Sequence, residues 1–184
     1  MGRTAATYER ELRELLRGDP EALRGYGRRL PPTDRAVLDV HRRRPFLVVR
    51  AAGSLGFDLV ALRPEFSFPL EVKASRDATI RFSAASGRAH EQLKAHRAAV
   101  DRVGLLVVYA FRRVGGDGGD PWRLFATAGA GIDGGSMRLL RNFLPPVAET
   151  KEGHGVLRWD EGRPLLEFLR RVAVLTERSP GPAA

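Results

Sequence analysis

Several residue types and patterns are missing from this 184-residue chain. Cysteine is absent, which excludes disulfide bonds and zinc sites built from thiolates. No apolar run approaches the ~20 residues that a membrane-spanning helix needs. Residues 1–6 lack the apolar core of a signal peptide, and position 6 is not the serine or threonine of a myristoylation site. We therefore expect a soluble, cytoplasmic protein.

Lysine is scarce, although the chain is strongly basic. Only three of the 31 basic residues are lysines, and 22 acidic residues leave a net charge of +9 and a pI near 11.0. A preference for arginine codons explains the ratio of arginine to lysine, but it does not explain the sign of the net charge. That excess suits a polyanionic partner such as DNA, RNA or an anionic membrane surface.

Length and hydrophobic periodicity predict one α/β domain with a mixed central sheet. Apolar residues at helical spacing, with capping residues before them, indicate helices near 7–17, 33–41, 86–102, 136–143 and 164–176. Short β-branched or apolar runs between turn residues indicate strands near 46–50, 57–62, 66–72, 76–82, 105–111 and 122–127. We expect residues 1–128 to form the core, with a basic insertion at about 18–45. Residues 129–184 are expected to form a C-terminal, partly helical addition on the core or at a dimer interface.

Three ionisable residues interrupt segments that otherwise resemble buried strands. Asp58 opens one apolar run, and Glu71 and Lys73 lie two residues apart in the next. Alternation along a strand places Glu71 and Lys73 on one face, with Leu70 and Val72 on the other. If the two strands pair as a hairpin, the carboxylates of Asp58 and Glu71 converge at one end of the sheet.

Two facing carboxylates repel each other, and burying them unpaired is costly. A divalent cation offsets that cost, and ligands that are all oxygen favour Mg²⁺, with Mn²⁺ as a substitute, over zinc. A nearby ammonium group can orient a nucleophile at such a centre, which makes this set suited to phosphodiester hydrolysis. The alternative from the pattern alone is that Asp58 lies in a turn, while Glu71 and Lys73 form an exposed pair on a solvated face.

The first predicted helix adds two candidate carboxylates. Its apolar face consists of Tyr8, Leu12, Leu15 and Leu16, and Glu9 and Glu11 lie at the two edges of that face. Helical geometry alone does not choose between them. Gln92, on the helix that follows the two strands, is a further residue that could approach the site.

Three motifs, taken in order, resemble the archaeal-type Holliday junction resolvases (the Hjc family) of the PD-(D/E)xK nuclease superfamily. They are YERELRELL (Tyr8–Leu16), VVRAAGSLGFDLVA (Val48–Ala61) and LEVKAS (Leu70–Ser75), and the likeness continues to PWRLFA (Pro121–Ala126). The resemblance covers about two-thirds of the chain. It implies a restriction-endonuclease-like core and a Mg²⁺-dependent endonuclease that leaves 5′-phosphate and 3′-hydroxyl ends.

The resemblance also implies roles for individual residues. Glu9 corresponds to the carboxylate that the helix contributes, Asp58 and Glu71 to the metal ligands, and Lys73 to the catalytic lysine. Ser54 corresponds to the serine of the loop before the aspartate, and the backbone carbonyl of Val72 is a further candidate ligand. The candidate DNA-binding residues are Arg10, Arg50, Arg76 and, in the insertion, Arg42, Arg43 and Arg44.

The partners that follow are a four-way DNA junction and a second copy of the chain, because a homodimer with two sites matches a two-fold substrate. The chain departs from the family in its long insertion after the first helix, in Pro69 within the Lys73 strand, and after Ala128. Pro69 cannot donate a ladder hydrogen bond, so we expect that strand to be locally an edge or bulged there. Two other functions remain open: a nuclease of the same core acting on flaps, forks, mismatches or foreign duplex, and a DNA-binding module without catalysis.

Overall fold

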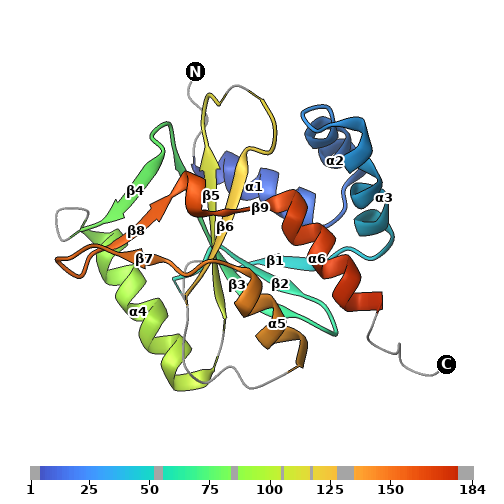
Figure 1. The fold of residues 1–184 in the computed structure, drawn as a ribbon. Coiled ribbons are helices and arrows are strands. Elements are labelled where there is room, and N and C mark those ends of the chain that lie inside the picture. The colour runs from blue at the N-terminus through green and yellow to red at the C-terminus, as the bar shows by residue number, and fades with distance from the viewer. Residues whose placement is uncertain are drawn as a thin grey trace.

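The computed structural model describes residues 5–51, 56–83, 87–104, 106–116, 118–127 and 135–177 (Figure 1). Its helices are α1 (Ala5–Leu16), α2 (Pro20–Gly27), α3 (Arg35–Arg43), α4 (Arg88–Val103), α5 (Gly135–Phe143) and α6 (Leu165–Glu177), with 3-10 turns η1 (Pro32–Asp34) and η3 (Trp159–Glu161). Its strands are β1 (Leu47–Arg50), β2 (Leu59–Leu62), β3 (Ser67–Ser75), β4 (Thr79–Phe82), β5 (Val107–Arg113), β6 (Trp122–Thr127), β7 (Ala148–Glu149), β8 (Gly155–Arg158) and β9 (Arg163–Pro164). None of the described helices is long and apolar enough to cross a membrane.

The main sheet has six strands in the order β1-β2-β3-β5-β6-β9. β3 and β5 run parallel, and every other neighbouring pair is antiparallel. The predicted hairpin is present, because β2 pairs with β3 with Leu59 opposite Leu70. The predicted fold class, a mixed central sheet flanked by helices, is therefore confirmed.

The two faces of this sheet carry separate apolar clusters. Leu70, Val72 and Val108 belong to the larger cluster, which also holds the apolar faces of α1 and α6. Tyr109 and Phe111 face the other side, where α4 and a three-stranded sheet in the order β4-β8-β7 cover them (Figure 1). β5 is buried on both faces because both of its side-chain rows contact a cluster, and a near-continuous apolar sequence is typical of such a strand.

The insertion contains a helix that the sequence interpretation missed. No helix was predicted for residues 20–27, but they form α2. The carboxylate of Asp19 accepts hydrogen bonds from the backbone N–H groups of Glu21 and Ala22, and Pro20 occupies the first turn, where it needs no hydrogen-bond partner. Buried Leu23 and Tyr26 then attach α2 to the main core.

The C-terminal segment, residues 135–177, pairs and packs with elements of the core. β8 pairs with β4, β9 pairs with β6, and α6 packs against α3. Leu165 and Phe168 of α6 are fully buried in the larger cluster. The segment also contains three short strands, β7 to β9, that periodicity did not indicate.

Candidate active site

Asp58 is positioned by hydrogen bonds to the neighbouring strand. Its backbone N–H donates to the carbonyl of Leu70 at 3.1 Å, and the backbone N–H of Val72 donates to its Oδ2 atom at 2.7 Å. The carboxylate of Asp58 is thus fixed beside β3, between the residues that flank Glu71. The convergence expected from the hairpin is present.

Glu71 and Lys73 share the face of β3 that Tyr109 and α4 cover. Lys73 Nζ lies 2.5 Å from Glu71 Oε1, and the Glu71 residue is only 2% exposed. Leu70 and Val72 are buried in the cluster on the opposite face, as strand alternation predicted. The alternative of an exposed Glu71–Lys73 pair on a solvated face is therefore wrong.

Pro69 has the local edge that the sequence predicted. It lies opposite Val60 of β2, while the parallel pairing with β5 begins one residue later, at Leu70. The missing N–H of proline thus falls where β3 has a paired neighbour on one side only. β3 becomes fully interior just before Glu71.

The environment of Glu71 disfavours its charge. Burial raises the pKa of its carboxyl group, the ammonium group of Lys73 lowers it and the charge of Asp58 raises it, and together they bring the pKa to about 7. Its second oxygen, Oε2, is buried and has no hydrogen-bond partner within the described residues. A buried, unpartnered carboxylate oxygen beside a second carboxylate is the environment that a bound hard cation would satisfy.

A side chain of helix α4 links Lys73 to the loop before Asp58. Gln92 accepts a hydrogen bond from Lys73 Nζ through Oε1 at 3.0 Å and donates from Nε2 to the carbonyl of Gly56 at 2.6 Å. Gly56 has a φ of +74°, a conformation that glycine adopts without strain. Gln92 therefore does contact Lys73, an approach that the sequence left open.

A second residue of α4, His96, supports the same carbonyl, a role that the sequence did not indicate. Its Nε2 lies 2.8 Å from the Gly56 oxygen, and its Nδ1 lies 2.7 Å from the hydroxyl of Tyr109. Burial lowers the pKa of His96, so the ring is neutral and carries one proton. A carbonyl can only accept, so Nε2–H donates to Gly56 and Nδ1 accepts from Tyr109. The spacing of Gln92 and His96, four residues apart on one helix face, is the signal that could have linked them.

Both acidic residues at the edges of α1 form ion pairs. Glu9 Oε2 lies 3.2 Å from an Arg50 guanidinium nitrogen, at the end of β1 that adjoins Asp58. Glu11 Oε1 lies 3.1 Å from Arg112 Nε, whose side chain is only 7% exposed. The structure therefore gives Glu11 a partner in the core and Glu9 a partner at the surface.

The expected group of three carboxylates is not assembled. Within the described parts of the chain, no three His, Cys, Asp or Glu side chains lie close enough together to hold a metal ion, so Glu9 does not join Asp58 and Glu71 here. Ser54 lies outside the described residues. Val72 contributes its N–H to Asp58, while a ligand role for its carbonyl stays a prediction.

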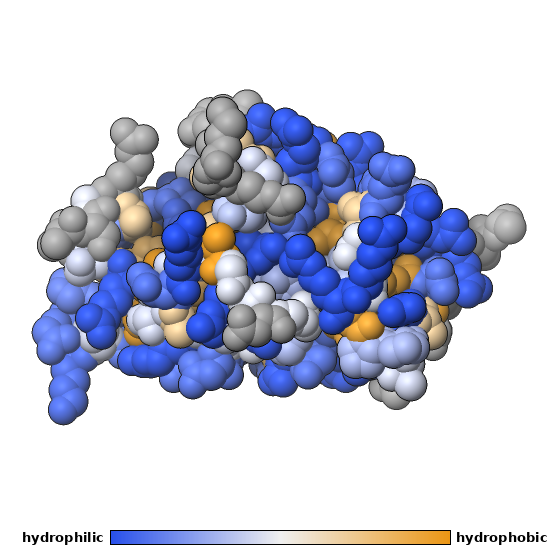
Figure 2. Space-filling view, turned by 90° about the horizontal axis from the view of Figure 1, so that it is seen from above, coloured by the Kyte–Doolittle hydropathy of each residue, from blue (hydrophilic) through white to orange (hydrophobic). Residues whose placement is uncertain are grey.

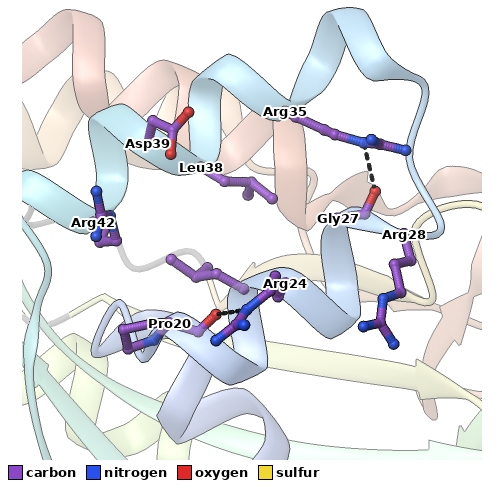
Figure 3. Close-up of a pocket in the computed structure, with 9 residues that line it drawn as sticks. Pro20, Arg24, Gly27, Arg28, Arg35, Leu38, Asp39 and Arg42 are labelled. Carbon is purple, nitrogen blue, oxygen red and sulfur yellow. Dashed lines mark hydrogen bonds between the residues drawn. The ribbon is translucent and has the colours of Figure 1, made fainter.

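The candidate DNA-binding arginines are all exposed, but they do not form one patch. Arg42 lines a pocket of about 480 Å³ between α2 and α3, together with Arg24, Arg28 and Arg35 (Figure 3). Arg43 and Arg44 line a different groove, between α3 and α6, and Arg44 is paired with Glu65 at 3.0 Å. The remaining three arginines lie on separate elements, Arg10 on α1, Arg50 on β1 and Arg76 in the turn after β3.

Comparison with known proteins finds similarity in fold. No protein-family model and no curated protein matches the sequence. The fold is similar to that of Archaeoglobus fulgidus Hjc, a Holliday junction resolvase from an archaeal hyperthermophile, at 17% identity and a TM-score of 0.45. The match covers 74% of this chain and 92% of that one. At that score the likeness carries no argument about activity.

Proposed function

We propose that this chain is a metal-dependent endonuclease that cleaves DNA, with Asp58, Glu71 and Lys73 at its catalytic centre. The observation that carries the proposal is the buried Glu71 carboxyl group, which has one oxygen unpartnered within the described residues and the other bonded to Lys73, beside the Asp58 carboxylate. A structural ion pair needs only one carboxylate. A second carboxylate and an unused oxygen indicate a cation site.

Asp58 and Glu71 would hold the cation, with the Val72 carbonyl as a further ligand. All of these donors are oxygens, which favours Mg²⁺, with Mn²⁺ as a substitute. When bound, such a dication stabilises the negative charge that develops on the phosphoryl group. Glu9, which Arg50 holds at the strand end that adjoins Asp58, would complete the set from α1 once its side chain turns from Arg50 toward the cation.

Lys73 would position the attacking water. Its ammonium group is held by Glu71 on one side and by Gln92 on the other, so its location is set by β3 and α4 together. Of its three N–H groups, two are used by these partners, which leaves one to donate to a water molecule or a phosphate oxygen.

A four-way junction is the substrate that we favour, and the resemblance of the three sequence motifs to Holliday junction resolvases supports it. A homodimer would present two such sites to the two-fold symmetric junction. The edge strand β1 offers a surface for a second copy, because Leu47 and Val49 are 63% and 43% exposed on the same face. Exposed apolar residues on an edge strand favour pairing with another chain.

A substrate panel tests this proposal. Purified protein is titrated with Mg²⁺ against an end-labelled four-way junction, a Y-fork and a plain duplex of the same sequence. We expect paired, symmetric nicks on the junction alone. Cleavage of the fork or duplex would favour a nuclease with another DNA target, while binding without cleavage of any substrate would contradict catalysis.

A further inference from the structure

A second cluster of arginines lies at the hairpin between β5 and β6, away from the proposed catalytic centre. Arg113 at the end of β5, Arg123 on β6 and Arg29 after α2 line a pocket of about 580 Å³, with Trp159 of η3. The hairpin stands at the top of Figure 1, and Figure 2 looks down on that end, where hydrophilic residues cover most of the surface. The proposed DNA interface does not include any of these three arginines.

The two strands bring Arg113 and Arg123 to one side of the sheet. Arg123 lies opposite Phe111 in the ladder, and Arg113 is two residues beyond Phe111. Both side chains therefore project from the face of the sheet that packs against Trp159. The guanidinium carbon of Arg123 lies 4.4 Å from the centre of the Trp159 ring, and that of Arg113 lies 5.9 Å from it. Two guanidinium groups therefore lie against the same indole ring.

These charges are only partly compensated within the described residues, because the Asp120 carboxylate, which lines the same pocket, interacts with the charge of Arg123. Arg29, Arg113 and Arg123 form no ion pair there, although Arg112 beside them is paired with Glu11. Arg123 donates to the carbonyls of Asp120 and Trp122, at 3.0 and 2.9 Å. The carboxylate of Asp120 is occupied by the backbone N–H groups of Trp122 and Leu166. Neighbouring like charges repel, so an anion bound between them would be stabilised.

We propose that this pocket binds a phosphate group of the DNA backbone, at a distance from the scissile phosphate. A planar guanidinium group can bind two phosphate oxygens at once, and four such groups line the pocket, of which that of Arg112 is already paired with Glu11. Tyr109 lies opposite Glu71, and Arg113 is four residues further along β5 on the same face, so about 13 Å of strand separates Arg113 from the level of Glu71, with Lys73 at the level between them. The inference rests on the proposed function, because it assigns a contact to the same DNA substrate.

The test measures junction binding without cleavage. Arg113→Gln with Arg123→Gln is introduced into the Asp58→Asn background, and fluorescence anisotropy follows the affinity for a labelled junction as the salt concentration rises. We expect several-fold weaker binding and a salt slope lower by about 0.9 for each lost phosphate contact. Arg158→Gln is the matched control, since Arg158 precedes Trp159 but is paired with Glu161. An unchanged affinity and slope in the double variant would overturn the proposal.

Further measurements guard against misfolding and separate the sources of phosphate. Arg29→Gln, made as a single change at an exposed side chain, should also lower the salt slope and leave the circular dichroism spectrum unchanged. If inorganic phosphate raises the Tm of the wild type but not of the double variant, while the slope is unchanged, the pocket takes free phosphate and the DNA assignment is wrong. If the wild type cleaves the junction and the variants change neither affinity nor salt slope, this inference is wrong but the proposed function stands. Absence of DNA binding and cleavage in the wild type defeats the proposed function as well.

Discussion

Lys73 Nζ lies between two oxygen atoms from different elements, 2.5 Å from Glu71 Oε1 on its own strand and 3.0 Å from Gln92 Oε1 on α4. The lysine is thereby fixed relative to both the sheet and the helix. Gln92 also reaches the Gly56 carbonyl, two residues before Asp58. One side chain thus connects the positions of the ammonium group and of the first carboxylate.

Replacing Gln92 should therefore weaken catalysis more than it weakens folding. We expect Gln92→Ala to lower kcat about tenfold, the cost of roughly one charge-assisted hydrogen bond, with little change in KM. Single-turnover cleavage of the labelled junction measures this. Glu91→Ala is the control, because Glu91 is the preceding residue and is paired with exposed Lys94. Equal rates for the two variants would remove Gln92 from the positioning of Lys73.

The raised pKa of Glu71 predicts how stability depends on pH when no metal is bound. The folded protein holds this proton up to pH about 7, whereas an unfolded chain releases it near its ordinary value of 4.5. The stabilisation is thus complete below pH 4.5 and is lost as the pH rises through 7, by roughly 3 kcal/mol. Glu71→Gln should remove this dependence.

Urea unfolding in EDTA, at pH 5 and pH 8, measures the difference between the wild type and Glu71→Gln. The difference is needed because burial also raises the pKa of Asp120, which adds a dependence of the same sign. Mg²⁺ should restore stability to the wild type at pH 8 and have no such effect on the variant. If the stability of the wild type changes between the two pH values by the same amount as that of the variant, the pKa of Glu71 is not raised by folding.

Glu9 and Glu11 should respond differently to removal of their charge. Glu9→Gln breaks a pair with a largely exposed arginine, so the free energy of unfolding should change by less than about 0.5 kcal/mol, while cleavage falls. Glu11→Gln leaves the buried guanidinium of Arg112 without its carboxylate, at a cost of roughly 1–3 kcal/mol. Thermal unfolding and cleavage assays on both variants give the comparison, and full cleavage by Glu9→Gln would rule out the role that the resemblance implies.

The proposed dimer should depend on the exposed face of β1. Leu47→Lys with Val49→Lys places two charges on that edge strand and should convert a dimer to a monomer in sedimentation equilibrium. Val103→Lys, a change at an apolar residue that is 54% exposed on α4, should leave the dimer intact. A dimer that persists in the β1 variant would place the interface elsewhere.

Much of the fold and of the site follows from short-range patterns. The two-residue period of β3 placed Glu71 and Lys73 together, and the run from Val107 to Phe111 gave a strand buried on both faces. Those patterns are local, so sequence alone expresses them. The resemblance selected Glu9 over Glu11, a choice that no feature of the described structure tests.

Long-range contacts could not be predicted. The bonds of Gln92 and His96 to Gly56 span 36 and 40 residues and depend on how α4 lies across the sheet. α2 was missed because two glycines lie within eight residues, although Asp19 and Pro20 are a capping signal. β7 and β9 have two residues each, too few for any periodicity.

The most direct test of the central claim is the Mg²⁺-dependent rate of junction cleavage by Asp58→Asn and Glu71→Gln. Loss of a cation ligand should lower the rate by roughly a thousandfold while junction affinity stays close to that of the wild type. Glu161→Gln, which removes an exposed carboxylate paired with Arg158, should cleave at the wild-type rate. Near-wild-type cleavage by either of the first two variants would contradict the account.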